Sequence, residues 1–371
     1  MKVQSPKSKV QGRKSRVGSP KCEVESLKSK GGSAESAVQS QKVEIEHHGL
    51  SRREFLWTTL AGGAGLALTR SRLFTAAAEA SLPVNFFAPL LVPKDGETLI
   101  TILHTNDQHS QIDPLPTNDR YAGKGGVARR ATLVKQIRKE NANTLLVDAG
   151  DSFQGTPYFN LYKGEVEYKA MSAVGYDVVT LGNHDFDNGI EALAAAMKFA
   201  TFEFVSANYD VRGTAIEKRV KPYVVRVMNG VRVGIFGLGI KLEGLNSPES
   251  FAGLKYYDPV KVARGAVRAL REVERCAMVV CLSHLGYYPK PKGDEIGDSQ
   301  VVGQVDGIDF IASGHTHTFM KQPVLVRQPS GKDTVIFQVG KSGIYLGRVD
   351  FTVKSGKVTA SAGRLLDLRN A

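Results

Sequence analysis

Five short polar clusters stand out beyond residue 100, and each follows a run of β-forming residues. They contain carboxylates, imidazoles and one amide, a ligand set that suits divalent metal ions of intermediate hardness. Two such ions can stabilise both the attacking and the leaving oxygen of a phosphoryl transfer. The clusters are Asp107-Gln108-His109, Gly150-Asp151, Gly182-Asn183-His184-Asp185, Ser283-His284 and Gly314-His315-Thr316-His317.

Each cluster has an ordinary structural explanation when it is taken alone. An isolated Asp-x-His is more often a turn or a surface pair, and His284 alone is more often a core histidine. Gly182-Asn183-His184-Asp185 could be a turn in which Asn and Asp cap the following helix. All five clusters in one chain, in this order, favour a metal-dependent site over these separate explanations.

The elements that would position these clusters alternate along the chain from residue 98 onward. Short β runs and helical patterns follow one another, as in a layered α/β protein, and such folds gather functional groups at strand ends. Asn229-Gly230 is the strongest hairpin signal, and Asp258 before Pro259 marks a helix start. We expect strands at 98–104, 144–148, 177–181, 202–207, 223–228 and 231–236, helices at 126–140, 166–174, 190–200 and 259–274, and mostly antiparallel strands at 321–364.

The ordered clusters resemble those of the calcineurin-like metallophosphoesterases, and within them the catalytic (N-terminal) domain of the 5′-nucleotidase family. The first motif reads Leu103-His104-Thr105-Asn106-Asp107-Gln108-His109, and further motifs occur at 126–130 and 340–347. The resemblance covers residues 98–366. It implies an α/β fold, a four-layer α/β/β/α sandwich with the metal site at the strand ends.

The resemblance also implies two divalent metal ions, for which Zn, Mn and Fe are candidates. Four side chains would hold each ion, and one carboxylate would be shared. The ligands of the first ion would be Asp107, His109, Asp151 and His317. Those of the second would be Asp151, Asn183, His284 and His315, which makes Asp151 the bridge.

His184 and Asp187 match the family's catalytic histidine and the acid that steadies it. By this resemblance, a hydroxide held by the metals would attack the phosphorus in line, without a covalent enzyme intermediate. His184 would stabilise or protonate the leaving oxygen. A carboxylate on the far ring nitrogen would fix its tautomer and charge.

The expected activity is hydrolysis of phosphate monoesters, with 5′-nucleotides as the first substrates to consider. Nucleotidases of this family carry a second, nucleoside-binding domain, whereas this sequence ends at Ala371, just after the expected catalytic domain. We therefore expect either a smaller, less discriminated substrate or a separate polypeptide that supplies the missing surface. Phosphodiester, cyclic-nucleotide and sulfur-ester hydrolysis stay open, whereas a catalytically weak binding subunit is disfavoured because no ligand is missing.

The first eighty residues are expected to precede the catalytic fold as a tail and a targeting segment. Residues 1–50 are rich in Lys, Ser, Gly and Gln, which predicts a disordered basic tail. Residues 51–80 contain Arg52-Arg53, an apolar run and Ala78-x-Ala80, and they resemble a twin-arginine signal peptide. We expect export to the periplasm or the extracellular space through the twin-arginine machinery, with a linker at 81–97. A short amphipathic or buried helix is the alternative.

The formal charge of +12 does not by itself indicate a nucleic-acid partner. Seven of these twelve excess charges lie in the first eighty residues, so the expected catalytic domain is only mildly basic. We expect no binding to nucleic acid.

Two further sequence features are expected to be structural. Cys276 and Cys281 lie in a predicted strand, where ~3.3 Å per residue would separate their Cα atoms by ~16 Å, so we expect free, buried thiols. The Gly-x-Gly at 237–239 and the Gly-Lys-Ser at 340–342 resemble parts of nucleotide-binding loops. Each lacks a required glycine, at 242 and 335, so we expect packing or turn glycines.

Overall fold

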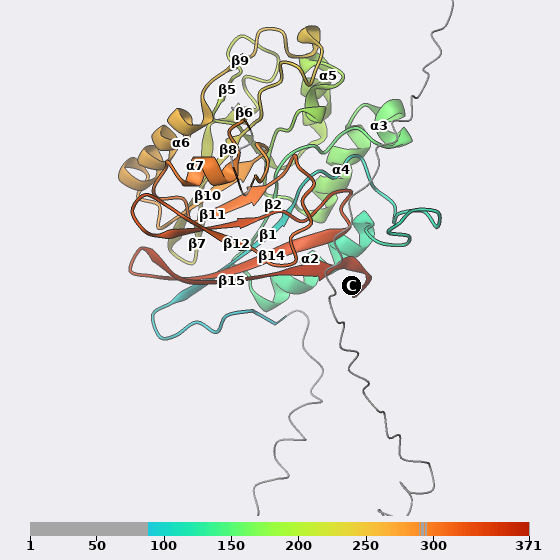
Figure 1. The fold of residues 1–371 in the computed structure, drawn as a ribbon. Helices are drawn as coiled ribbons and strands as arrows, with labels where there is room; N and C mark the ends of the chain where they lie inside the picture. Colours follow the sequence, from blue (N-terminus) through green and yellow to red (C-terminus); the bar gives the residue numbers. More distant parts are fainter. Residues whose placement is uncertain (1–87, 289, 291–292, 294, 371) are drawn as a thin grey trace, which may run out of the picture. The chain divides into compact units, whose positions relative to one another are not determined.

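Most strands of the protein belong to two β-sheets. The computed structural model describes residues 88–288, 290, 293 and 295–370. In this part of the chain a seven-stranded sheet has the order β15-β14-β1-β2-β3-β4-β6, and a six-stranded sheet has the order β12-β13-β11-β10-β8-β7 (Figure 1). A small third sheet pairs β5 with β9.

The strands have the following bounds. The seven-stranded sheet contains β1 (Thr98–Thr105), β2 (Thr144–Asp148), β3 (Val178–Thr180), β4 (Glu203–Val205), β6 (Val220–Lys221), β14 (Tyr345–Lys354) and β15 (Lys357–Asp367). The six-stranded sheet contains β7 (Tyr223–Met228), β8 (Val231–Leu238), β10 (Met278–Ser283), β11 (Phe310–Ser313), β12 (Val324–Arg327) and β13 (Asp333–Phe337). The small sheet contains β5 (Tyr209–Asp210) and β9 (Lys255–Tyr256).

Two of the α-helices continue directly into a turn of another type, α5 into a 3₁₀ turn and α6 into a π-helical turn. The α-helices are α2 (Val127–Glu140), α3 (Pro157–Tyr162), α4 (Glu165–Val174), α5 (Ile190–Ala196), α6 (Pro259–Arg268) and α7 (Asp298–Val302). The 3₁₀ turns are η2 (His184–Phe186), η3 (Met197–Phe199), η4 (Pro248–Phe251) and η6 (Leu368–Asn370), and η5 (Ala269–Val273) is a π-helical turn. No helix among the described residues is both long enough and apolar enough to cross a membrane.

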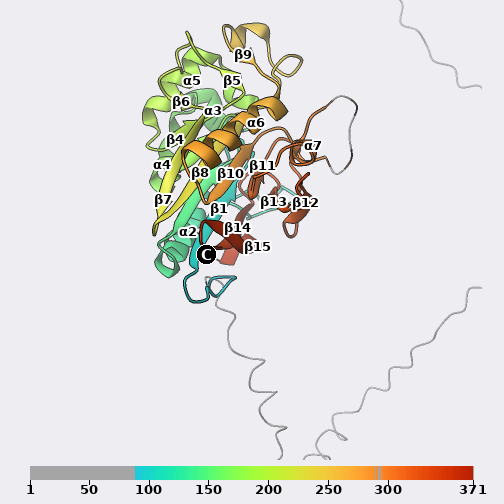
Figure 2. The same cartoon turned by 90° about the vertical axis from the view of Figure 1, so that its left-hand side faces the viewer.

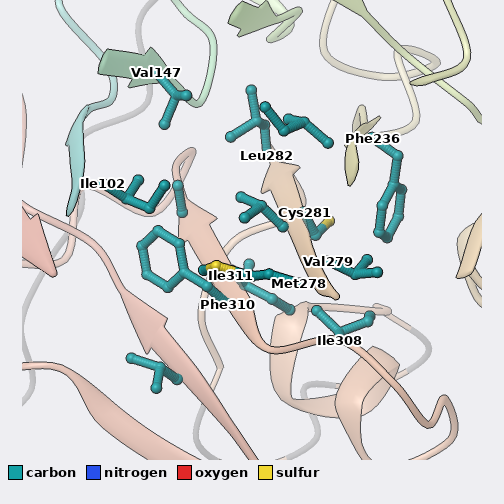
Figure 3. Close-up of a cluster of buried hydrophobic side chains, with 14 of the residues drawn as sticks. Ile102, Val147, Phe236, Met278, Val279, Cys281, Leu282, Ile308, Phe310 and Ile311 are labelled. Carbon is teal, nitrogen blue, oxygen red and sulfur yellow. The ribbon is translucent and has the colours of Figure 1, made fainter. Parts of the chain in front are cut away.

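Two hydrophobic clusters join four layers. Consecutive residues of a strand point to opposite faces, and in β1 Ile102 belongs to one cluster while Leu103 belongs to the other. The first cluster joins the two sheets, with Ile102 and Val147 on one side and Leu282 and Phe310 on the other (Figure 3), and it continues to α6 and α7. The second cluster joins the seven-stranded sheet to α2, α4 and α5. In Figure 2, α4 and α5 lie on one side of the sheets and α7 on the other. The four-layer α/β/β/α sandwich is therefore confirmed.

Each sheet contains a run of strands that are parallel to one another. These are β1, β2, β3, β4 and β6 in the seven-stranded sheet and β8, β10, β11 and β13 in the six-stranded sheet. Antiparallel strands adjoin them, with β14 beside β1, β7 beside β8 and β12 beside β13. The carboxyl ends of parallel strands meet at one edge of a sheet. This edge is where the polar clusters follow the strands.

Several local predictions agree with the structure. Asp258 caps α6 by accepting a hydrogen bond from the Lys261 backbone N–H at 2.8 Å. β7 and β8 form the expected hairpin around Asn229 and Gly230, whose φ angles are 45° and 80°. The glycine at 237 is a packing glycine, since a Cβ there would lie 2.2 Å from the carbonyl oxygen of Val205 in the other sheet.

Other predictions need correction. Cys276 and Cys281 are free and buried as expected, but only Cys281 lies in a strand, because β10 begins at Met278. The carbonyl of Cys276 accepts a hydrogen bond from the Arg271 side chain at 3.0 Å instead of joining a ladder. The predicted helix at 259–274 changes to a π-helical turn after Arg268, and α3 and α7 were not predicted.

The expected tail and signal peptide lie outside the described residues, as does the first part of the expected linker. The described part of that linker contacts β14. The Leu90 backbone N–H donates to Asp350 Oδ2 at 2.6 Å, and Lys354 Nζ donates to the carbonyl of Asp95 at 2.9 Å.

Candidate metal centre

All seven candidate ligands lie at the carboxyl ends of parallel strands. Asp107 and His109 follow β1, Asp151 follows β2, and Asn183 follows β3 in the seven-stranded sheet. The remaining three follow strands of the six-stranded sheet, His284 after β10 and both His315 and His317 after β11. The site thus forms where the edges of the two sheets meet.

The first group of ligands contains Asp107, His109 and His317. The Nε2 atoms of the two histidines are 2.9 Å apart, and His317 Nε2 lies 3.3 Å from Asp107 Oδ1. His109 Nδ1 lies 3.3 Å from the carbonyl oxygen of Phe153, which holds the ring with Nε2 toward the group. Two imidazole nitrogens and a carboxylate oxygen therefore converge on one point.

The second group contains Asp107, Asp151 and His284. His284 Nε2 lies 3.1 Å from Asp151 Oδ2 and 3.9 Å from Asp107 Oδ1. Asn183 Oδ1 and His315 Nδ1 lie 3.1 Å apart, and the His315 backbone N–H donates to Asp107 Oδ1 at 3.1 Å. Asp107 is thus the residue common to both groups, whereas Asp151, the carboxylate expected to bridge, belongs to the second group.

His284 shows why a cation fits here. Its Nδ1 lies 2.7 Å from the carbonyl oxygen of Ala149, so the neutral ring carries its proton on Nδ1. The lone pair of Nε2 then faces the buried carboxylate of Asp151, which is repulsive unless a proton or a metal ion lies between them. Burial alone would lower the pKa of His284, but Asp151 and Asp107 raise it to about 10. A divalent ion would satisfy the same need for positive charge.

The other imidazoles are suited to bind as neutral ligands. Burial lowers the pKa of His315 to about 4. Burial also lowers the pKa of His109, although Asp151 and Asp107 oppose the effect. Since a metal ligand must be deprotonated, both rings have their nitrogen lone pairs free for an ion at neutral pH.

The backbone of the site is strained. Five of the seven candidate ligands have φ angles between 49° and 68°, a left-handed conformation that non-glycine residues seldom adopt. Such residues persist only where the surrounding structure holds them, and they gather at functional sites. The five are Asp107, His109, Asp151, His315 and His317.

His184 and Asp187 form a hydrogen-bonded pair beside the first group. Their Nδ1 and Oδ2 atoms are 2.9 Å apart, and the ring centroids of His184 and His109 are 5.4 Å apart. The hydrogen bond to Asp187 raises the pKa of His184, against an opposing effect of burial. The pair is tied to the centre because the His184 backbone N–H donates to Asp151 Oδ1 at 2.8 Å.

Three residues outside the ligand set position the site. Asn106 donates to Asp107 Oδ2 at 2.6 Å. Asn246 donates to Asp187 Oδ1 at 3.2 Å and to the carbonyl of Asn183 at 3.0 Å. No sequence signal pointed to Asn246, because it lies in a loop without a motif, 59 residues from Asp187.

The third positioning residue, Asp185, has a different role from the helix cap considered above. Its buried carboxylate accepts hydrogen bonds from the backbone N–H groups of Gly182, Asp151 and Ser152 at 2.8, 3.0 and 3.0 Å. It therefore joins the loops after β2 and β3. Gly182 allows this close approach, since a Cβ there would lie 2.2 Å from Asp151 Oδ1.

The comparisons with known proteins agree with the fold and the site. A family described as "Calcineurin-like phosphoesterase" matches residues 100–319. The chain therefore belongs to this family of metal-dependent phosphoester hydrolases, as its motifs predicted.

Among its relatives are 5′-nucleotidases. The 5′-nucleotidase of Rattus norvegicus is 34% identical over 292 residues, which are 72% of this chain and 49% of that protein. A snake venom 5′-nucleotidase of Gloydius brevicauda is 31% identical over 312 residues, 77% of this chain and 51% of that protein. The crystal structure of a 5′-nucleotidase precursor from Thermus thermophilus matches with a TM-score of 0.65 at 33% identity, covering 73% of this chain and 54% of that one. The chain thus spans about half the length of the curated relatives it matches.

Asp185 and Asp187 should contribute differently to the free energy of unfolding. Asp185→Asn places an amide N–H₂ against backbone donors in a buried position, so we expect a loss of ~1–3 kcal/mol in the free energy of unfolding. Asp187→Asn changes a partly exposed ion pair and should lose less than ~1 kcal/mol. Urea denaturation of both variants measures this difference, and equal losses would contradict the separate roles.

Proposed function

We propose that this protein hydrolyses phosphate monoesters at a centre of two divalent metal ions, with 5′-nucleotides as the preferred class. The proposal rests on one observation, the convergence of seven candidate ligands in two adjoining groups with His184 and Asp187 beside them. The similarity to 5′-nucleotidases supports the substrate class.

The ligands are assigned to the two ions as the motifs suggest. Asp107, His109, Asp151 and His317 would hold one ion, and Asp151, Asn183, His284 and His315 would hold the other. When bound, the ions would polarise the phosphoryl oxygens and lower the pKa of the attacking water. The carboxylates and imidazoles of the chain would fix where the ions lie and thereby where a phosphate can bind.

Protonation of the leaving oxygen is assigned to His184. Its Nδ1 is taken by Asp187, so Nε2 is the atom that can donate a proton to the leaving oxygen. Asp187 stabilises the charged ring, and Asn246 holds Asp187 through its other oxygen. The leaving alkoxide would thereby depart as an alcohol.

A substrate screen with the purified full chain tests the proposed class of reaction. Nucleoside and sugar monophosphates, phosphodiesters, cyclic nucleotides and sulfur esters are assayed with Zn²⁺, Mn²⁺ and Fe²⁺. Monoesters should be cleaved fastest. A preference for diesters or sulfur esters would overturn the proposal. Weak discrimination among bases would favour recognition by a surface outside this chain, such as a separate substrate-binding polypeptide.

The role of His184 predicts a specific kinetic result. His184→Ala should lower turnover by ~10²–10⁴-fold, the range for a positioned acid, while metal content stays at the wild-type level. The loss should be smaller for p-nitrophenyl phosphate, whose leaving group departs without a proton. Steady-state kinetics on nucleoside monophosphates and on this activated ester, with metal analysis of each preparation, make the comparison.

Asp187→Asn serves as the graded control for His184. It should lower turnover in the same direction but less, because it only orients and charges the ring. An equal loss on both kinds of ester would mean that His184 binds phosphate in the ground state. Loss of metal from His184→Ala would make His184 a ligand instead.

We also propose export through the twin-arginine route, on the basis of Arg52-Arg53 and the apolar run that follows. That route reads the arginine pair itself. Replacing both arginines by Lys should leave the precursor in the cytoplasm, as measured by cell fractionation. Unchanged export would indicate the general secretory route or a different translation start.

A further inference from the structure

The segment 338–342, which we name the clasp, follows β13 and contacts two ligand-bearing loops. Gln338, its first residue, is fully buried. Its side-chain nitrogen donates to Ser313 Oγ at 2.7 Å and to the carbonyl of Gly314 at 2.6 Å. Its side-chain oxygen accepts from Thr316 Oγ1 at 3.0 Å and from the Thr318 backbone N–H. One side chain thus makes four hydrogen bonds along the loop that carries His315 and His317.

The rest of the clasp holds the loop that carries Asp107. The Val339 backbone N–H donates to Asn106 Oδ1 at 3.0 Å, and Asn106 Nδ2 donates to the carbonyl of Gly340 at 2.6 Å. The Ser342 backbone N–H donates to the carbonyl of Asp107 at 2.7 Å. The clasp therefore joins two loops whose ligands, Asp107 and His317, meet in the first metal group.

The clasp also accounts for the Gly-Lys-Ser that resembles part of a phosphate-binding loop. Gly340 has a φ of 83°, and a Cβ there would lie 2.2 Å from the ring of Phe319. Glycine is thus needed for the turn that carries the chain from Gln338 to Ser342. In this protein the motif serves to hold the Asp107 loop.

The loops need such support because their backbone is strained. His315 and His317 have φ angles of 68° and 51°, and this loop lies outside helix and strand. Gln338 supplies both donors and acceptors to it, so neither an aliphatic nor an acidic side chain could replace all four bonds. Residues that orient metal ligands typically change metal affinity ~10–100-fold when they are lost.

We propose that Gln338 is a positioning residue which holds the 313–318 loop in its metal-binding conformation and thereby sets the affinity of the first metal group. The inference rests on the proposed function only in requiring that the centre binds divalent ions. Its effect on the first metal group acts through His317, because Gln338 bonds the residues on either side of it, Thr316 and Thr318. Gln338 is not among the candidate ligands.

Gln328, which follows β12 as Gln338 follows β13, offers a matched control. It is also buried, and its side chain makes three hydrogen bonds. Its oxygen accepts from the Gly307 backbone N–H at 2.7 Å. Its nitrogen donates to the Ile308 carbonyl at 2.8 Å and to Thr334 Oγ1 at 2.9 Å. Gly307 and Ile308 lie before β11 and Thr334 lies near the start of β13, so these contacts are at the ends of the two strands away from His315. Gln328→Leu therefore loses similar bonds without touching a ligand-bearing loop.

The test measures Zn²⁺ affinity of the metal-free full chain by competition with a chromogenic chelator, and records the visible spectrum of the Co²⁺-loaded protein. Gln338→Leu should weaken Zn²⁺ binding ~10–100-fold at one site and alter the Co²⁺ bands. Gln338→Glu keeps the volume and the one acceptor oxygen but loses the two donated bonds to Ser313 and Gly314, so it should also weaken Zn²⁺ binding. It tests the positioning role if the Leu variant does not fold. Gln328→Leu should bind Zn²⁺ like the wild type.

The outcomes separate this inference from the proposed function. If the wild-type chain binds no divalent ion, the proposed function fails. If the wild type binds ions and both Gln338 variants bind them equally well, the positioning role is wrong. Equal weakening in Gln338→Leu and Gln328→Leu would also overturn it, since the effect would then be general destabilisation.

Discussion

The central constraint in this structure is the burial of carboxylates and imidazole lone pairs that face one another. Asp151 Oδ2 and His284 Nε2 lie 3.1 Å apart with both side chains buried, and the His284 proton is held on the other nitrogen by Ala149. Unpaired charge in such a place is unfavourable by several kcal/mol. Positive charge is therefore required between them, and either a proton on His284 or a divalent ion at the converging ligands would supply it.

The fold meets this constraint by bringing strand ends together and then restraining the loops that follow them. Two apolar cores hold the sheets, so that loops after β1, β2, β3, β10 and β11 meet at one edge. The left-handed conformations of the ligands are then held by buried side chains, notably Asp185 and Gln338. The rigidity of the centre thus comes from these hydrogen bonds, and its position comes from the sheets.

Much of this arrangement could be predicted from sequence, because strand ends and metal-ligand types are local signals. The five clusters contain all seven candidate ligands, five of which lie in the two groups of possible metal ligands, and His184 and Asp187 form a hydrogen-bonded pair. The positioning residues were harder to find. Asn246 and Gln338 act across 59 and 24 residues of chain, and a lone amide in a loop or after a strand has no distinctive pattern. Cys276 likewise lies outside β10, and its carbonyl accepts a hydrogen bond from the Arg271 side chain, a contact that the sequence pattern does not reveal.

The most direct test of the account is the metal content per chain of the wild type, Asp151→Asn and Asp107→Asn, measured by elemental analysis on folded protein. The wild type should hold two divalent ions. Asp151→Asn should lose affinity for both, because a neutral amide bridges two cations poorly, and Asp107→Asn should weaken the group that contains His109 and His317 at least as much. Two ions retained in Asp151→Asn, with turnover near that of the wild type, would contradict the bridging role and the electrostatic argument built on it.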